Sequence, residues 1–245
     1  MSRFSAFAIH LGISFLIFLV LAYLVVFEWY PGIFFENDGG WRGMRIIIAV
    51  DLVLGPLLTL VVYKAGKPGL RTDLTLIGLL QVVCLAAGTW VVHSEKPLAV
   101  VYTEGRFTVM SADDYVADAG IAVPDLRHFP GDNPKWVMVQ MPEDAATEHE
   151  VFSQSFRSGR LMNTLTDYYA PFTSEIPGFI DAAENPEDIK ISKEWEQRLN
   201  NWLDENGGTL DDYAFYTFST RYAFGYLVYQ RDNFEKVGLI TNLDA

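Results

Sequence analysis

Long apolar runs dominate the first part of the chain and alternate with short polar segments. Residues 4–27 contain no Asp, Glu, Lys or Arg, residues 46–63 are apolar apart from Asp51 and Thr59, and residues 74–92 are apolar apart from Thr75, Gln81 and Thr89. A helix rises about 1.5 Å per residue, so about 20 residues cross a bilayer core of about 30 Å. The pattern predicts three membrane spans, which form a three-helix transmembrane bundle over residues 1–93.

The first run also invites comparison with a cleaved signal peptide. Such a peptide has a shorter apolar core and a small-x-small cleavage site. The residues that follow here, LAYLVVFEWYPG, offer no such site. We therefore expect residues 4–27 to be an uncleaved anchor.

Basic residues indicate the direction of the spans. Lys64, Lys67 and Arg71 lie in KAGKPGLRTD, the Gly/Pro-rich turn between the second and third runs. Loops that carry Lys and Arg remain in the cytoplasm in most membrane proteins. The turn is therefore predicted to be cytoplasmic, with the amino terminus on the same side and all residues after His93 on the opposite side.

After His93 the pattern changes to that of a globular domain. Alternating apolar positions predict a hairpin of residues 98–103 and 106–110 across Glu104-Gly105, a strand at 135–140, and two more strands within 213–230. Helices are predicted at 143–157 and from Asn185-Pro186 to Gly207-Gly208, because Asn can cap a helix and Pro fits its first turn. Residues 94–245 are thus predicted to form an α+β extracytoplasmic domain.

Charge and composition exclude several classes of function. Residues 94–245 hold twelve basic and twenty-six acidic residues, a net charge of −14, so nucleic acid is not an expected partner. Cys84 is the only cysteine, and the four histidines show no ligand spacing. Nucleotide-binding and hydrolase motifs are also missing from the sequence. We expect no cofactor, no metal and no enzymatic activity, whereas the spans imply contact with the lipid bilayer.

Asp51 and Pro56 are the unusual residues of the second run. An ionisable residue within a span costs about 2.5–3.5 kcal/mol, and such residues usually face protein or water. Counted from residue 46, Asp51 lies roughly 8–10 Å deep, where Tyr23 and Thr89 are the expected partners. Pro56 frees the carbonyl of Leu52 and is expected to kink the helix. A structural role in the bundle and a partner-binding role both remain open for Asp51.

Two further pairs are candidates for contacts. His10 and Gln81 lie at similar distances from the cytoplasmic ends of their spans, so they are expected to meet in a separate polar layer. In the final strands, Tyr216 and Tyr229 lie off the main aromatic parity. Unless the sheet is covered on both faces, such residues are exposed, which makes them candidate surface contacts.

Several residues of the spans together resemble the type IV pilin accessory proteins of the TfpX/TfpZ group. The most specific element is VDLVLGPLLTL, and the resemblance covers roughly residues 1–110. Lys96-Pro97 stands where the family pattern leads us to expect Arg-Pro. The residues that carry the resemblance are Trp41, Gly43, Asp51, Gly55, Pro56, Leu57, Thr59, Lys64, Arg71, Asp73, Gln81, Gly88, Lys96 and Pro97.

The resemblance implies a non-enzymatic, chaperone-like accessory factor of the bacterial inner membrane. It would bind and stabilise a cognate major type IV pilin, promote pilus assembly and place residues 94–245 in the periplasm. The candidate pilin contacts are His10, Asp51, Pro56, Gln81, Tyr216 and Tyr229. A membrane-anchored extracytoplasmic sensor or ligand-binding protein is the alternative, but little of the chain would face the cytoplasm to carry a signal. An intramembrane enzyme using Asp51 would need a second catalytic group at the same depth.

Overall fold

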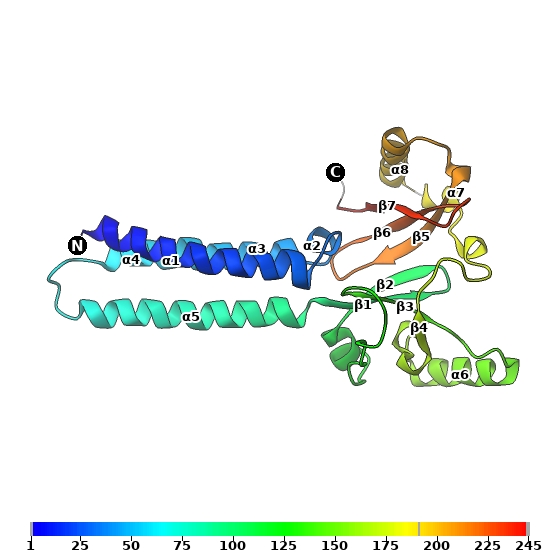
Figure 1. Cartoon of the computed structure of the whole chain (residues 1–245), viewed down its shortest axis with the longest axis horizontal. Coiled ribbons are helices and arrows are strands. Elements are labelled where there is room, and N and C mark those ends of the chain that lie inside the picture. The colour runs from blue at the N-terminus through cyan, green and yellow to red at the C-terminus, as the bar shows by residue number, and fades with distance from the viewer. Residues whose placement is uncertain (1, 191, 244–245) are drawn as a thin grey trace. The chain divides into compact units, whose positions relative to one another are not determined.

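The computed structural model describes residues 2–190 and 192–243 and divides into two compact units (Figure 1). The first, Met1–Lys96, is helical, and the second, Pro97–Ala245, is built on a seven-stranded mixed sheet with helices. This confirms the predicted fold class, a three-helix transmembrane bundle followed by an α+β domain.

Three helices of the first unit are long and apolar enough to cross a membrane: Arg3–Trp29, Gly40–Val62 and Leu70–Ser94. Each is longer than its apolar run, because a helix continues to its caps and not only to the first polar residue. The elements are α1 (Arg3–Tyr23), π-helical η1 (Leu24–Trp29), α2 (Phe34–Asn37), α3 (Gly40–Ile47), π-helical η2 (Ile48–Leu54), α4 (Gly55–Val62) and α5 (Leu70–Ser94).

The second span is the centre of the bundle, since α4 packs against both α1 and α5. At its other end, a Cβ on Gly43 would lie 2.6 Å from Val92 Cγ2, so only glycine allows α3 and α5 to approach this closely. Tyr30 Oη donates to the Val92 carbonyl at 2.9 Å in the same region. Large apolar side chains such as Leu16 and Val61 point outward, as expected of surfaces that lipid covers.

The second unit has the strand order β4-β3-β1-β2-β5-β6-β7. β1 pairs with β3 and β2 with β5 in parallel, and the remaining neighbours are antiparallel. The predicted hairpin is confirmed: Glu104 and Gly105 both have positive φ and connect β1 to β2. The strands are β1 (Pro97–Thr103), β2 (Arg106–Ser111), β3 (Lys135–Val139), β4 (Tyr169–Pro171), β5 (Tyr213–Ser219), β6 (Phe224–Gln230) and β7 (Lys236–Thr241).

Helical segments of the second unit are mostly short. The predicted helix after Asn185 is interrupted: Asn185 does cap a helix, but this helix ends at Ile189, and a second begins at Lys193 with Ser192 as its cap. Ile191 lies outside the described residues. The segments are η3 (Asp114–Asp118), α6 (Ala145–Ser158), η4 (Met162–Thr164), η5 (Thr166–Tyr168), η6 (Ile180–Ala182), α7 (Pro186–Ile189), α8 (Lys193–Asn206) and η7 (Leu210–Asp212).

Both faces of the sheet are buried. One face carries two apolar clusters, the first around Val101 and Val137 and the second around Phe215 and Val228 beneath Leu199 of α8. The opposite face carries an aromatic cluster, which the loop after β4 covers. Its members are Tyr102, Phe107, Trp136, Phe172, Phe179, Tyr216 and Tyr229.

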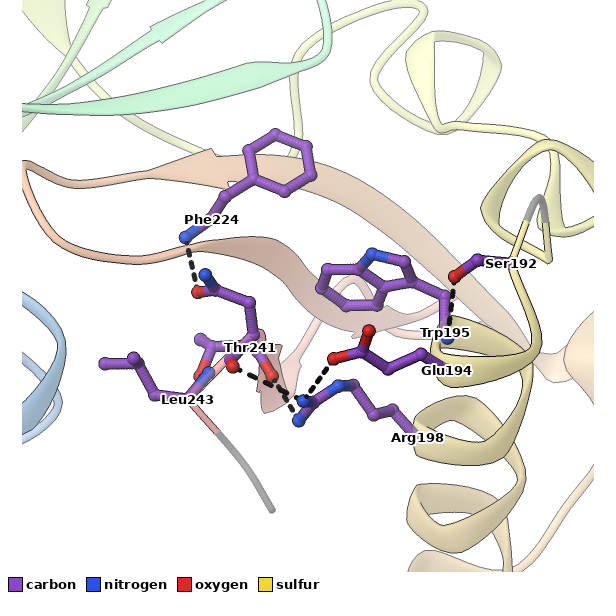
Figure 2. A network of polar contacts seen from close by, with 8 residues as sticks. Ser192, Glu194, Trp195, Arg198, Phe224, Thr241 and Leu243 are labelled. Atoms are coloured by element: carbon purple, nitrogen blue, oxygen red, sulfur yellow. Dashed lines mark hydrogen bonds and ion pairs between the residues drawn. The ribbon is translucent and has the colours of Figure 1, made fainter.

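Polar contacts tie α8 to the edge strand β7 (Figure 2). Arg198 Nη1 donates to the Thr241 carbonyl at 3.0 Å, and Arg198 Nη2 lies 2.8 Å from Glu194 Oε1. At the helix start, Ser192 Oγ accepts from the Trp195 amide at 3.3 Å. These contacts fix the helix over the second apolar cluster.

Candidate functional site

The residues with the most unusual surroundings lie inside the helical unit, where side chains from all three spans form one polar network. It consists of His10 and Ser14 of α1, Asp51 of η2, Thr59 of α4 and Gln81 of α5. Ser14, Asp51 and Thr59 are buried, whereas His10 and Gln81 are half-buried. We refer to these five residues as the three-helix polar network.

Asp51 is held by one of its two carboxylate oxygens. Oδ1 accepts from Ser14 Oγ at 3.0 Å and from Gln81 Nε2 in a short contact. Oδ2 is buried and has no hydrogen-bond partner among the described residues. A buried carboxylate oxygen without a hydrogen-bond donor costs free energy. The network therefore offsets only part of the free-energy cost of burying Asp51.

Gln81 connects the two ends of the network. Its Nε2 contacts Ser14 Oγ at 3.1 Å and the Asp51 carbonyl at 3.3 Å, besides the Asp51 carboxylate. Its Oε1 lies 2.7 Å from His10 Nε2, which must be the donor because an amide oxygen only accepts. The amide thus links α1 to the second and third spans.

His10 completes the network toward α4. Its Nδ1 lies 2.5 Å from Thr59 Oγ1, and Thr59 Oγ1 also donates to the Gly55 carbonyl at 3.2 Å. The prediction that His10 and Gln81 meet is confirmed by their 2.7 Å contact. Their predicted placement in a layer separate from Asp51 is wrong, because Gln81 bonds both His10 and Asp51.

The partners predicted for Asp51 are also wrong, because Ser14 and Gln81 supply its hydrogen bonds. The second helix begins at Gly40 and ends at Val62, so eleven residues lie on each side of Asp51, and it sits roughly 16 Å from either end. The expected partners Tyr23 and Thr89 therefore do not reach it. Tyr23 is 55% exposed, and Ser14 takes its place. The sequence offers one signal for Ser14: it follows His10 by four residues and so shares its helix face.

Gly55 and Pro56 shape the second span around the network. A Cβ on Gly55 would lie 2.6 Å from Gln81 Nε2 and still closer to Oε1, so glycine makes room for the Gln81 side chain. Pro56 has no amide proton, and the turn before it is π-helical over Ile48–Leu54, with the Gly55 amide bonding the Val50 carbonyl. The disturbance expected from Pro56 thus takes the form of a π-helical segment that includes Asp51.

The two tyrosines predicted at the surface of the second unit are buried, and this prediction is wrong. Tyr216 is 0% and Tyr229 4% exposed, and both belong to the aromatic cluster. Tyr216 Oη donates to the Phe179 carbonyl at 2.8 Å. The prediction required one face of the sheet to be solvated, whereas the loop after β4 covers that face. Neither side chain is available to a partner in this structure.

Comparison with known proteins adds to this geometry. The chain is similar to fimbrial assembly proteins of Dichelobacter nodosus. It is 27% identical over 179 residues to the proteins of serogroup E1 and serogroup I, which covers 72% of this chain and 69% of each relative. The protein of serogroups C1 and C2 is 28% identical over 112 residues, 45% of this chain and 86% of that relative. No family model matches the sequence, and no solved structure matches it.

Among residues 2–190 and 192–243, no group of three or more His, Cys, Asp or Glu side chains has the geometry to hold a metal ion. Within the three-helix polar network, every polar side-chain group except Asp51 Oδ2 has a hydrogen-bond partner on another span. The arrangement fixes the helices relative to one another and presents two half-buried polar groups, His10 and Gln81, within an apolar surface.

Proposed function

We propose that this protein is a non-enzymatic accessory factor of the bacterial inner membrane that binds and stabilises a cognate major type IV pilin and so promotes pilus assembly. The observation that carries the proposal is the similarity, over 72% of the chain, to two proteins named as fimbrial assembly proteins. The TfpX/TfpZ resemblance of the spans points in the same direction.

The positions of the resembling residues support this proposal. Asp51, Gly55, Thr59 and Gln81 belong to or make room for the polar network, and Gly43 allows α3 to approach α5. A sequence element that shapes a helix bundle suits a protein that receives another apolar helix in the membrane. The exposed apolar faces of the spans provide the area for such a helix.

Within this proposal, the candidate residues have different roles. His10 and Gln81 are half-buried and can be reached from outside the bundle, so they are the candidate contacts for a polar group of the pilin helix. Asp51 and Pro56 are buried, and they act by positioning Gln81 and the second span. Residues 97–245 would lie in the periplasm beside the globular part of the pilin.

The test is co-purification of the pilin with the detergent-solubilised full-length protein. Asp51→Asn should keep the protein at its normal level, because asparagine Oδ1 can still accept from Ser14 and Gln81, and should lower pilin recovery several-fold, because a neutral amide oxygen accepts more weakly than a carboxylate and holds Gln81 less firmly. Gln81→Leu should lower it further. Thr75→Val, on the exposed face of α5, is the matched control.

The outcomes separate the site from the function. Full pilin recovery with both network variants would show that the network does not contribute to pilin binding. Failure of the unaltered protein to retain any pilin would contradict the proposed function itself. Loss of the Asp51→Asn protein itself would show that Asp51 serves only the bundle.

A further inference from the structure

The three-helix polar network uses all of its hydrogen-bond donors internally. Ser14 Oγ donates to Asp51 Oδ1, and the two hydrogens of Gln81 Nε2 are shared among the Asp51 carboxylate, the Asp51 carbonyl and Ser14 Oγ. His10 Nε2 donates to Gln81 Oε1. One further hydrogen bond joins His10 Nδ1 to Thr59 Oγ1, and the Thr59 hydroxyl also has a backbone carbonyl one turn earlier as an acceptor. Whichever of Nδ1 and Oγ1 donates, no N–H or O–H group of these five side chains lacks an acceptor.

The hydrogen-bonding capacity that remains in the network consists of acceptors. An amide oxygen has two lone pairs, and His10 occupies only one lone pair of Gln81 Oε1. Asp51 Oδ2 is a second unused acceptor, but it is enclosed within the bundle. Of the two half-buried side chains of the network, only Gln81 therefore has capacity left. A group outside the bundle that bonds to the network must donate the hydrogen.

Gly78 leaves room beside Gln81. It precedes Gln81 by three residues and so lies on the same side of α5. Gly78 is half-buried, yet no atom lies within 4 Å of the position that a Cβ would take. At Gly43 and Gly55, by contrast, a Cβ would overlap side chains of the bundle itself. The space at Gly78 is therefore not used within the bundle, and small residues at such positions let the backbone of a further helix approach closely.

The depth of Gln81 decides what can cover this surface. Eleven residues of the span Leu70–Ser94 precede Gln81 and thirteen follow it, so it lies near the middle of the membrane. In hydrocarbon, an unused acceptor costs free energy because no water bonds to it. Polar side chains at this depth are commonly satisfied by hydrogen bonds between helices. A transmembrane helix therefore suits this surface better than lipid does.

We propose that Gly78 and Gln81 form a docking site for a transmembrane helix that carries a hydrogen-bond donor, such as a Ser, Asn or Gln side chain, in the middle of the membrane. The helix approaches over Gly78, and its donor bonds to Gln81 Oε1. A group that can only accept finds no free donor and is disfavoured. The inference rests on the proposed function only in identifying this helix with the apolar helix of the pilin.

The donor requirement is tested with designed helices instead of the pilin. The probes are three fluorescein-labelled 21-residue poly-leucine peptides whose central residue is Asn, N,N-dimethylasparagine or Leu, and their binding to the full-length protein in detergent micelles is followed by fluorescence anisotropy. The dimethylated amide accepts but cannot donate. We expect the Asn peptide to bind about threefold to tenfold more tightly than the Leu peptide, and the dimethylated peptide no more tightly than the Leu peptide.

Two variants and a matched control locate the site. Gln81→Leu removes the acceptor and should abolish the advantage of the Asn peptide over the Leu peptide. Gly78→Leu should abolish it as well, because the new side chain keeps the helices apart, while its Cβ meets no atom of the bundle. Gly12→Leu is the control: its Cβ also meets nothing within 4 Å, and Gly12 follows His10 by two residues, which places it on nearly the opposite side of α1.

Each outcome bears on one part of the inference. Equal binding of the three peptides, or an advantage of the dimethylated peptide as large as that of the Asn peptide, would overturn the donor requirement. Persistence of the Asn advantage in Gln81→Leu, or its loss in Gly12→Leu, would overturn the location. The peptides contain no pilin sequence, so the two proposals fail separately. Pilin retention without discrimination among the peptides contradicts the inference alone, and discrimination without pilin retention contradicts the proposed function alone.

Discussion

At the scale of single residues, Gln81 explains how an aspartate is accommodated in the middle of an apolar helix. A charged side chain within a span costs about 2.5–3.5 kcal/mol, and hydrogen bonds between spans recover about 0.6 kcal/mol each on average. Ser14 and Gln81 supply two such bonds to Asp51 Oδ1, while Oδ2 remains without a partner in the described structure. The network thus lowers the cost of Asp51 without removing it, which favours retention of Asp51 for a purpose other than stability.

Gly55→Ala should damage the network although alanine is the better helix former. The new Cβ would overlap the Gln81 amide group, so Gln81 must leave Asp51 or His10. We expect a loss of about 1–3 kcal/mol in the free energy of unfolding, measured by thermal denaturation in detergent. Gly88→Ala is the matched control, because its Cβ would meet only Ile46 Cγ2 at 4.0 Å, and it should be neutral or stabilising. Equal behaviour of the two variants would contradict the packing argument.

At the scale of elements, the β1–β2 turn combines two demands on one glycine. Gly105 has a φ of +82°, and a Cβ there would overlap the Ala182 carbonyl oxygen. Gly120 has a φ of +65°, and no atom lies within 4 Å of the position a Cβ would take. An alanine at this position would therefore measure the cost of backbone strain alone.

Gly105→Ala should therefore destabilise the second unit more than Gly120→Ala does. We expect about 1 kcal/mol for the strain at Gly120 and at least twice that at Gly105, from denaturant unfolding followed by near-ultraviolet circular dichroism. Similar losses at the two positions would mean that the loop containing Ala182 moves away without cost.

Regular elements were predictable from the sequence because they rest on local patterns. The three spans follow from apolar length, and the β1–β2 hairpin follows from alternation around Glu104-Gly105. The two errors in the network have one cause. Positions along the second span were counted from residue 46, where the apolar run begins, whereas the helix begins at Gly40. Asp51 therefore lies level with Ser14 and Gln81 instead of Tyr23 and Thr89.

Burial of Tyr216 and Tyr229 was not predictable in the same way. Their cover is an irregular loop that contributes Phe172 and Phe179 and has neither helical nor strand periodicity. Strands β4 and β7 were likewise missed. β4 has only three residues, and the alternation in β7 is weakened by Gly238, which lies against Trp202. Ser14 shares a helix face with His10, but the sequence does not show that this face of α1 points toward Asp51.

At the scale of the whole molecule, buried tyrosines make the acidic second unit sensitive to alkali. Burial raises the pKa of Tyr115 to about 12, and burial also raises the pKa values of Tyr169 and Tyr229. The fold favours the neutral phenols, so their contribution is complete below the usual tyrosine pKa of about 10 and is lost as the pH rises through 12.

The free energy of unfolding of the second unit should therefore fall by roughly 3 kcal/mol for Tyr115 alone between about pH 10 and pH 12. Denaturant unfolding at several pH values, with tyrosinate absorbance recorded in parallel, measures this loss. Tyr115→Phe, which removes the ionisable hydroxyl that contacts Tyr169 Oη at 3.1 Å, should reduce the pH dependence. An unchanged slope in this variant would assign the alkaline sensitivity to other groups.

The orientation of the spans decides which compartment the acidic unit occupies. Arg3, Lys64, Lys67 and Arg71 lie at one end of the spans and Arg42, Arg45 and Lys96 at the other, so the excess of basic residues is small. Lys67 is also paired with Asp73 at 2.6 Å, although acidic residues contribute little to orientation. We predict that a reporter active only outside the cytoplasm will be active when fused after Ala245 and inactive when inserted within residues 66–69. Substituting Lys64 and Arg71 by Gln should reduce the difference in reporter activity between the two positions, because the end of the spans that carries these residues then has no excess of basic residues. The reverse activity pattern in the unaltered chain would place the acidic unit in the cytoplasm, where it would have no access to an assembled fimbria.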